Sequence, residues 1–312
     1  MGTPEFAVPS LKKIVAAGYE IVLVVTSPDK PRARGNSDPE PTPVKRAAMD
    51  LGLRVFEVED LKSVEFLEAV KAASPDVIAV VAFRILPQEI FTLARTGTFN
   101  LHASLLPKYR GAAPINWAII EGEKETGVTT FFLQEKVDTG NIILQRRMYI
   151  GEQENATDLA ARLSVLGAEA VLETLQQIES NTFQLTTQNN ALATKAPKLS
   201  KDNTKIDWTA DAVRTHNFVR GLALRPAAWT TFAGKTVKVF QTALAETPFV
   251  AVSGGTSPSE VAGTWLVSGE KLFAACGDGY IEILSMQIEG KKRLAAADFL
   301  RGYRAGGSEK FE

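Results

Sequence analysis

The chain has 312 residues, and its 45% hydrophobic and 23% charged content is ordinary for a globular protein with one large core or two domains. A formal net charge of −1 gives no nucleic-acid-binding signature by itself, and no apolar run approaches the roughly 20 residues that span a bilayer. The single cysteine, Cys276, excludes an intrachain disulfide, and no signal peptide is visible. These features predict a cytoplasmic protein that is not associated with a membrane.

The first half of the sequence alternates between predicted strands and predicted helices. Short runs of apolar, often β-branched residues are typical of buried strands and occur at residues 21–26, 54–58 and 76–83. Helices are expected at residues 9–18, 43–52 and 64–73, with Ser63 as an N-cap of the last. This order predicts an α/β fold with a doubly wound, mostly parallel, Rossmann-like sheet. Ligands of such sheets bind beyond the carboxyl ends of the strands.

The second half of the sequence predicts a different architecture. A long amphipathic helix is expected at residues 155–180, after which the chain becomes polar and rich in turn residues. A helix at residues 212–221 precedes short strands and glycine-rich turns such as the one at 253–255. The strands are expected at residues 229–232, 237–242, 261–267, 272–276 and 280–288. This pattern predicts a small β-barrel. We therefore place a first domain at residues 1–182, a linker at 183–204 and a barrel domain at 205–312.

The most informative motif is Asn100-Leu101-His102, at the end of a predicted strand, and His102 is one of two histidines in the chain. Side chains at positions i and i+2 of a strand point to the same face, so Asn100 and His102 can serve one pocket. Asp138 lies between two apolar runs and is expected in a strand-to-strand turn. An Asn at a strand end, an Asp-Thr-Gly turn and a single His are also common structural features, so spacing alone leaves a structural role open.

An amide, an imidazole and a carboxylate suit acyl or formyl transfer to an amine. The tetrahedral intermediate carries a negative oxygen that needs preplaced hydrogen-bond donors, and Asn100 and His102 can supply them. The attacking amine must also lose a proton, which a histidine oriented by a carboxylate can carry. The sequence leaves open whether His102 or Asp138 takes this proton. No sulfur or further metal ligand lies nearby in the sequence, so we expect no metal.

Longer motifs surround these residues and extend to the end of the chain. They are GTPEFAVPSL at residues 2–11, FNLHASLLPKYRGAAPINW at 99–117, VDTG at 137–140, APKLSK at 196–201, IDW at 206–208, GKKR at 290–293 and DFL at 298–300. Across nearly its whole length, the sequence closely resembles the methionyl-tRNA formyltransferase family. The motifs around Asn100, His102 and Asp138 are shared with a wider group of enzymes that use 10-formyltetrahydrofolate. The C-terminal motifs narrow the resemblance to the tRNA enzyme.

The resemblance implies transfer of a formyl group from 10-formyltetrahydrofolate to the α-amino group of methionyl initiator tRNA. It implies catalytic roles for Asn100, His102 and Asp138, and an oligonucleotide-binding-type barrel in the second half of the chain. It also implies that one loop holds the folate, formed by Ser104, Leu105, Leu106 and Pro107. We expect a monomer.

Two basic segments are candidates for contacts with tRNA. In the family, the region of the loop at residues 30–35 embraces the end of the acceptor stem, and Arg34 is the residue that matches. The family usually continues with lysines, whereas Asp38 and Glu40 follow here and weaken phosphate attraction. The turn formed by Lys291, Lys292 and Arg293 is expected to contact tRNA phosphates. A solvated run of charges is the alternative for this turn.

The start of the sequence also departs from the family. A β-strand precedes the Gly-Thr-Pro turn in the family, whereas this chain begins at Met1-Gly2. We expect unpaired strand edges and apolar helix faces at that place, and a start displaced from that of the family.

Other functions remain open from the sequence. The nearest alternative keeps the folate donor and formylates a small amine, such as an amino sugar nucleotide or a ribonucleotide. Folate-dependent hydrolysis is a further alternative, and a non-catalytic tRNA-binding module comes from a different class. A dehydrogenase is not expected, because no G-x-G-x-x-G motif follows a strand.

Overall fold

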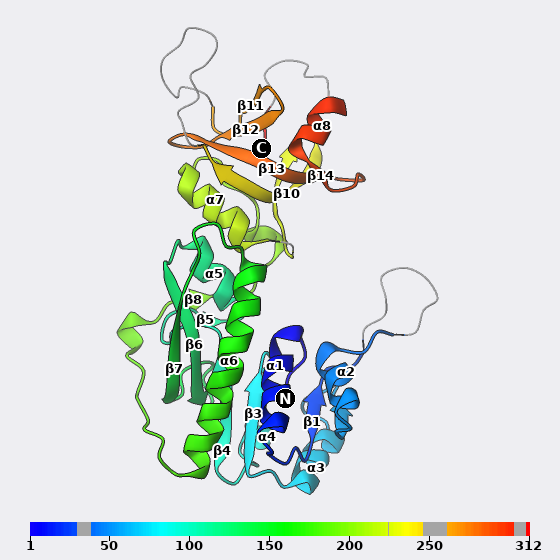
Figure 1. Cartoon of the computed structure of the whole chain (residues 1–312), viewed down its shortest axis with the longest axis vertical. Helices are drawn as coiled ribbons and strands as arrows, with labels where there is room; N and C mark the ends of the chain where they lie inside the picture. Colours follow the sequence, from blue (N-terminus) through cyan, green and yellow to red (C-terminus); the bar gives the residue numbers. More distant parts are fainter. Residues whose placement is uncertain (30–38, 224, 246–260, 303–309) are drawn as a thin grey trace. The chain divides into compact units, whose positions relative to one another are not determined.

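The computed structural model describes the chain except for residues 30–38, 224, 246–260 and 303–309 (Figure 1). The chain divides into two compact units. The first comprises Met1–Pro114, Glu125–Tyr149 and Ala160–Pro197, and the second comprises Ile115–Lys124, Ile150–Leu159 and Lys198–Glu312. The long helix α6 (Ala156–Glu179) therefore has its first residues in the second unit and the rest in the first.

The strands of the first unit form a mixed sheet and a parallel pair. The sheet has the order β3-β4-β6-β7, with bounds Val77–Val81, Gly97–His102, Glu125–Phe132 and Ile142–Tyr149. Strands β3 and β4 are parallel, whereas β6 is antiparallel to both β4 and β7. The separate parallel pair is β1 (Val24–Thr26) with β2 (Val55–Glu57). The strands predicted at residues 21–26, 54–58 and 76–83 are thus all present, and each is shorter than predicted.

Helices alternate with these strands, as predicted. They are η1 (Glu5–Ala7), α1 (Val8–Ala16), α2 (Pro43–Asp50), α3 (Val64–Ala73), α4 (Gln88–Phe91) and most of α6. Helix α3 has the predicted bounds, and the Ser63 hydroxyl caps it by accepting a hydrogen bond from the Phe66 amide. In α2, the Thr42 hydroxyl does the same for the Lys45 amide. The α/β character expected from the alternation is confirmed.

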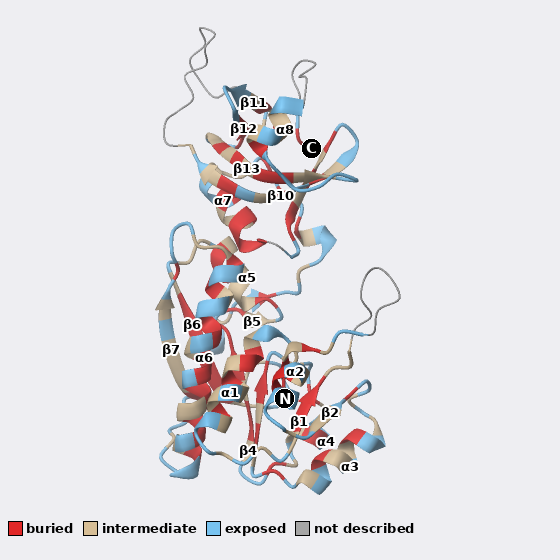
Figure 2. Cartoon of the chain, turned by 45° about the vertical axis from the view of Figure 1, so that its right-hand side comes forward, coloured by how far each residue is buried: buried red, intermediate tan, exposed pale blue. Residues whose placement is uncertain are grey.

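Helix α6 lies against the mixed sheet. A Cβ added at Gly167 of α6 would lie 2.6 Å from a Leu101 methyl group of β4, so glycine permits this close approach. The hydroxyls of Thr174 and Thr130 are hydrogen-bonded at 2.7 Å between α6 and β6. Phe99 and Phe131 on the neighbouring strands β4 and β6 have no exposed surface, and the buried residues follow the strands (Figure 2).

Met1 and Gly2 lie between β1 and β3. The Gly2 amide donates to the Val25 carbonyl, and the Val81 amide donates to the Met1 carbonyl. The Met1 ammonium donates to the Ala79 carbonyl at 2.7 Å. These two residues thus connect the parallel pair to the mixed sheet. The connection includes one isolated β-bridge, between Gly2 and Val81.

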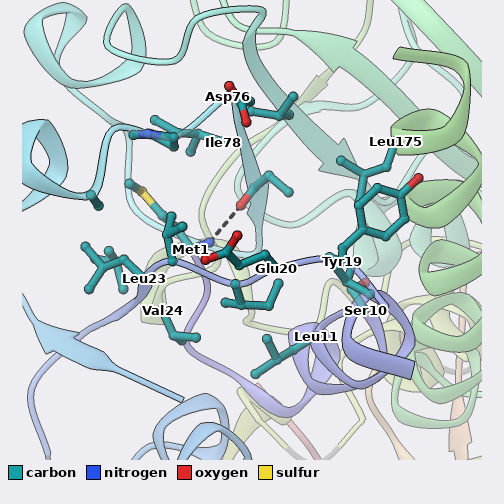
Figure 3. Close-up of a pocket in the computed structure, with 18 of the residues that line it drawn as sticks. Met1, Ser10, Leu11, Tyr19, Glu20, Leu23, Val24, Asp76, Ile78 and Leu175 are labelled. Carbon is teal, nitrogen blue, oxygen red and sulfur yellow. Dashed lines mark hydrogen bonds between the residues drawn. The ribbon is translucent and has the colours of Figure 1, made fainter. Parts of the chain in front are cut away.

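A cavity of about 550 Å³ lies beside Met1 (Figure 3). Its lining comes from the strand residues Val24 and Ile78 and from Leu11 and Leu175 on helices. Burial lowers the pKa of the Met1 ammonium from 8.0 to about 5.

The second unit is built on one antiparallel sheet. Its order is β11-β12-β13-β10-β9, and β14 pairs with β13. The strand bounds are β9 Ala228–Phe232, β10 Lys235–Leu244, β11 Trp265–Ser268, β12 Lys271–Ala275, β13 Tyr280–Ile288 and β14 Leu294–Ala295. The helices are α5 (Pro114–Ile120), α7 (Ala212–Gly221) and α8 (Ala296–Gly302). The helix predicted at 212–221 and the strand predicted at 280–288 have the observed bounds. The turn predicted at 253–255 lies outside the described residues.

Aromatic side chains form much of the core of the second unit. The rings of Phe232 and Trp265 have centroids 4.3 Å apart, and those of Trp208 and Phe311 stack at 5.3 Å. Cys276 is buried in the same cluster. Burial raises the pKa of its thiol to about 11.

The segment predicted as a linker is partly ordered on the first unit. Strand β8 (Lys195–Ala196) pairs in parallel with β5 (Arg110–Gly111), and Thr186 pairs with Ile142. Two short 3₁₀ helices, η2 (Asn190–Leu192) and η3 (Lys201–Asn203), lie in the same stretch. In the part of the chain that the structure describes, no helix is long and apolar enough to cross a membrane.

Candidate active site

Strand β4 positions Asn100 and His102 on one face of the mixed sheet. Asn100 is paired with Val80 of β3 and Phe131 of β6, and His102 is paired with Thr129 of β6. Their i and i+2 spacing directs both side chains to the same side, as predicted. Within the described residues, the Asn100 amide group makes no hydrogen bond, so it is available to a bound molecule.

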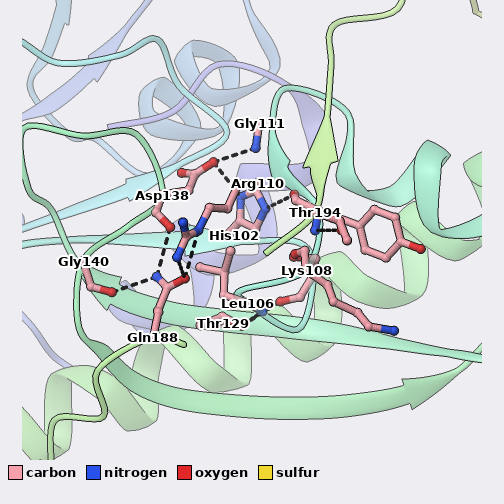
Figure 4. Close-up of polar contacts among 12 residues, drawn as sticks. His102, Leu106, Lys108, Arg110, Gly111, Thr129, Asp138, Gly140, Gln188 and Thr194 are labelled. Carbon is pink, nitrogen blue, oxygen red and sulfur yellow. Dashed lines mark hydrogen bonds and ion pairs between the residues drawn. The ribbon is translucent and has the colours of Figure 1, made fainter. Parts of the chain in front are cut away.

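The His102 ring is held from two sides (Figure 4). Its Nε2 lies 2.8 Å from the Tyr109 carbonyl oxygen. A carbonyl can only accept, so Nε2 carries the hydrogen and donates it. The other ring nitrogen, Nδ1, lies 3.7 Å from Oδ2 of Asp138, and the two side chains are only 6% and 10% exposed. The structure thus brings together two of the three predicted catalytic residues.

Asp138 lies in the turn between β6 and β7, as predicted from the flanking apolar runs. Its φ of +55° is in the left-handed region, which Asp tolerates better than most residues. The Gly111 amide donates to its Oδ2 at 2.8 Å. A Cβ added at Gly140 would lie 1.7 Å from the Phe132 carbonyl oxygen, so the turn requires glycine there. Backbone geometry therefore sets where the carboxylate points.

The loop that carries Ser104, Leu105, Leu106 and Pro107 is fixed from below by β6 and β7. The Thr129 hydroxyl donates to the Ser104 carbonyl at 2.6 Å and accepts from the Leu106 amide at 3.1 Å. The Gln145 amide group donates to the Leu106 carbonyl and to the Thr129 hydroxyl, both at 2.9 Å. Because Thr129 is also paired with His102, the loop is tied to the strand position next to the imidazole.

Two further residues, Gln188 and Thr194, contact the segments around His102 and Asp138 and were not predicted from the sequence. The Thr194 hydroxyl accepts from the Tyr109 amide at 2.8 Å, and its carbonyl accepts from the Arg110 amide at 2.9 Å. Gln188 contacts Arg110, Asp138 and Gly140 through its side chain. Both lie in the polar stretch interpreted as a linker, and no local pattern distinguishes them from other polar residues there.

The residues predicted to bind tRNA lie away from His102 and Asp138 in the sequence, and the structure describes three of the four. Arg34 lies outside the described residues. Lys291 and Lys292 are exposed in the turn between β13 and β14 of the second unit. The Arg293 guanidinium, however, donates to the Ser285 hydroxyl at 2.8 Å and lies 4.4 Å from the Phe240 ring centroid. All three residues are thus exposed, and the Arg293 guanidinium also contacts its own sheet.

Among the described residues, no group of three or more His, Cys, Asp and Glu side chains is placed to hold a metal ion.

Comparison with known proteins assigns this arrangement to a class. The family model described as formyl transferase matches residues 1–175, and the one described as formyl transferase, C-terminal domain, matches residues 198–304. The chain therefore belongs to the formyl transferase class.

Full-length relatives narrow this class. The methionyl-tRNA formyltransferase of Chlorobium luteolum is 55% identical over 97% of this chain and 96% of the relative. The methionyl-tRNA formyltransferase of Chlorobium phaeovibrioides is 57% identical over 98% of this chain and 94% of the relative. This chain belongs to the methionyl-tRNA formyltransferase family, which confirms the resemblance seen in the motifs.

Solved structures share the fold at low sequence identity. The N-formyltransferase of Helicobacter canadensis, in complex with folinic acid and dTDP-3-aminofucose, is 20% identical with a TM-score of 0.64, over 94% of this chain and 97% of that chain. HypX of Aquifex aeolicus, in complex with tetrahydrofolic acid, is 22% identical with a TM-score of 0.59, over 85% of this chain and 47% of that chain. These structural similarities confirm the predicted fold class. At this sequence identity they are evidence for the fold alone.

Proposed function

We propose that this protein transfers the formyl group of 10-formyltetrahydrofolate to the α-amino group of methionyl initiator tRNA, giving N-formylmethionyl-tRNA. The observation that carries the proposal is the 55% identity over nearly the full length to a methionyl-tRNA formyltransferase. The buried pair of His102 and Asp138 supplies the chemistry that such a transfer needs.

The reaction joins the amine nitrogen to the formyl carbon and breaks the bond from that carbon to the folate nitrogen. In the tetrahedral intermediate, the former carbonyl oxygen is negative and is stabilised by hydrogen-bond donors that are already in place. The Asn100 amide is one donor. His102 is the second when its Nδ1 carries a proton.

The amine loses its proton to the pair formed by His102 and Asp138. Because Nε2 donates to the Tyr109 carbonyl, Nδ1 is the ring nitrogen left to accept a proton, and it faces Oδ2 of the carboxylate. A proton taken there gives an imidazolium next to a carboxylate, which stabilises the charged ring. The leaving folate nitrogen then takes up a proton, so the pair is restored.

The folate is held by the loop of Ser104, Leu105, Leu106 and Pro107. Hydrogen bonds from Thr129 and Gln145 keep the backbone of this loop in one conformation, so its polar groups can face a flat pterin ring without further ordering.

The tRNA is held in part by Lys291 and Lys292, whose exposed ammonium groups suit phosphate contacts. Arg34 remains a candidate contact from the sequence, and Arg293 supports the turn that presents the lysines. The enzyme acts as a monomer.

The test is to incubate the chain with 10-formyltetrahydrofolate and methionyl initiator tRNA and to count formylmethionine on the tRNA. Formylation by the parent and its loss in His102→Ala and Asp138→Ala support the proposal. Parallel reactions contain an amino sugar nucleotide, or no acceptor. Formylation of the sugar in place of tRNA, or folate consumption without an acceptor, would overturn the assigned acceptor.

A further inference from the structure

The Gln188 side chain joins the two chain segments that carry the proposed catalytic pair (Figure 4). Its Oε1 accepts from Nε and Nη2 of Arg110, at 3.1 and 2.7 Å. Its Nε2 donates to the carbonyls of Asp138 and Gly140, at 2.9 and 2.8 Å. One side chain therefore connects the segment that follows β4 to the turn between β6 and β7.

These four contacts require a primary amide of this length. The oxygen faces a guanidinium, which only donates, and the nitrogen faces two carbonyls, which only accept. A carboxylate could still bind Arg110 but would set its second oxygen against two carbonyl oxygens. A thioether of similar size would satisfy neither side. Gln188 is 6% exposed, so water cannot readily replace what either substitution removes.

The groups that Gln188 fixes are those that set the geometry of His102 and Asp138. The residue before Arg110, Tyr109, provides the carbonyl that fixes Nε2 of His102. The residue after it, Gly111, donates to the Asp138 carboxylate. On the other side, Gln188 holds the carbonyl of Asp138 itself, whose backbone is in the left-handed region. A turn in that region needs such contacts to keep its conformation.

We propose that Gln188 is a positioning residue that holds the Asp138 carboxylate opposite Nδ1 of His102. The inference rests on the proposed function for its kinetic consequence and on geometry alone for its structural consequence. The segment predicted as a linker thus contributes to the catalytic site, through Gln188 and through the pairing of β8 with β5.

The kinetic test compares Gln188→Met and Gln188→Glu with the same two changes at Gln184, an exposed glutamine of the same segment. We expect kcat to fall at least tenfold in both Gln188 variants, with KM for tRNA within about twofold, because binding surfaces are unchanged. In Gln188→Glu, the added negative charge favours the protonated form of the pair, so the acid limb of the kcat profile moves to higher pH. The Gln184 variants should match the parent.

A second measurement does not depend on turnover. The chain has two histidines, so ¹⁵N imidazole spectra resolve His102, with His216 of the second unit as an internal reference. In Gln188→Met we expect the His102 ring signals to shift and the His216 signals to stay in place, in protein with a parent-like melting curve. Unchanged His102 signals together with unchanged kcat would overturn the proposal. If the parent chain shows no formylation but the His102 signals still shift in Gln188→Met, the proposed function is contradicted and the positioning role stands.

Discussion

Two regions of the first unit differ in how closely their residues pack. At the turn between β6 and β7, Asp138 is held by contacts from Gly111 and Gln188, and Gly140 fits with no room for a Cβ. Beside Met1, a cavity of about 550 Å³ is lined by residues of β1 and β3, and Gly2 forms a single bridge to Val81 there. The difference shows that the position of the carboxylate is specified more closely than the packing between β1 and β3 in this chain.

The largest expected effect is at the closely specified region. His102→Ala and Asp138→Ala should each lower kcat by about 10²- to 10⁴-fold, because each removes a group that handles the amine proton. The double variant should be little worse than either single one, since the two side chains act as a unit. Formylation assays and melting curves measure both. Additive losses in the double variant would show that the two residues act separately.

Thr129→Val tests whether buried hydrogen bonds hold the loop. The change leaves the Leu106 amide and the Ser104 carbonyl without this partner, so stability should fall by about 1–3 kcal/mol. Thr126→Val on the same strand is the matched control, because its buried hydroxyl has no hydrogen-bond partner. Urea unfolding of both variants gives the comparison. Equal losses at the two positions would mean that the hydroxyl contacts of Thr129 contribute nothing.

At the loosely packed region, pH should affect stability through Met1. The folded chain disfavours the charged amine, so the unfolded chain binds more protons between pH 5 and 8, and stability rises with pH across this window. Between pH 6.5 and 8 the gain should be about 1.6 kcal/mol, because the slope of about 1.36 kcal/mol per unit falls as the pH approaches 8. Urea unfolding at both pH values measures it.

A second group contributes to the same rise. Burial lowers the pKa of His216 from 6.5 to about 4, so most of its contribution is gained below pH 6.5 and about 0.4 kcal/mol is left between pH 6.5 and 8. A chain with an acetylated amine should keep only this smaller rise, and a rise as large as that of the parent would place its origin elsewhere.

The smallest expected effect is at Ser10, whose hydroxyl lines the cavity and is buried without a partner. Ser10→Ala should change stability by no more than about 0.5 kcal/mol, or increase it, because no hydrogen bond is lost. Urea unfolding would detect a larger loss, which would indicate that the hydroxyl has a role in this region.

The sequence predicted those parts of the molecule that local patterns encode. Ser63 and the periodic apolar residues after it predicted α3 with its observed bounds, because a cap and a helical face are local features. The i and i+2 spacing placed Asn100 and His102 on one face, and the flanking apolar runs placed Asp138 in a turn. The proximity of His102 to Asp138 came from the family resemblance and not from spacing.

The rest depends on contacts between distant segments. Strand β8 is two residues long and pairs with β5 some 85 residues earlier, so neither strand has a periodic pattern. Gln188 acts through an amide that any exposed glutamine also has, and only the fold places it next to Arg110. The strand expected at residues 21–26 begins at Val24, where pairing with Val55 starts. In each case the tertiary partner, and not the local residues, decides the outcome.

The single thiol of the second unit can be used to follow opening of the core around it. With a pKa of about 11, only about one Cys276 side chain in 10⁴ is a thiolate at neutral pH, and the sulfur is buried. A disulfide reagent therefore reacts only while that core is open, and no other sulfhydryl contributes to the signal. The kinetics of thiol–disulfide exchange at Cys276 can therefore report local opening of the antiparallel sheet without an added label.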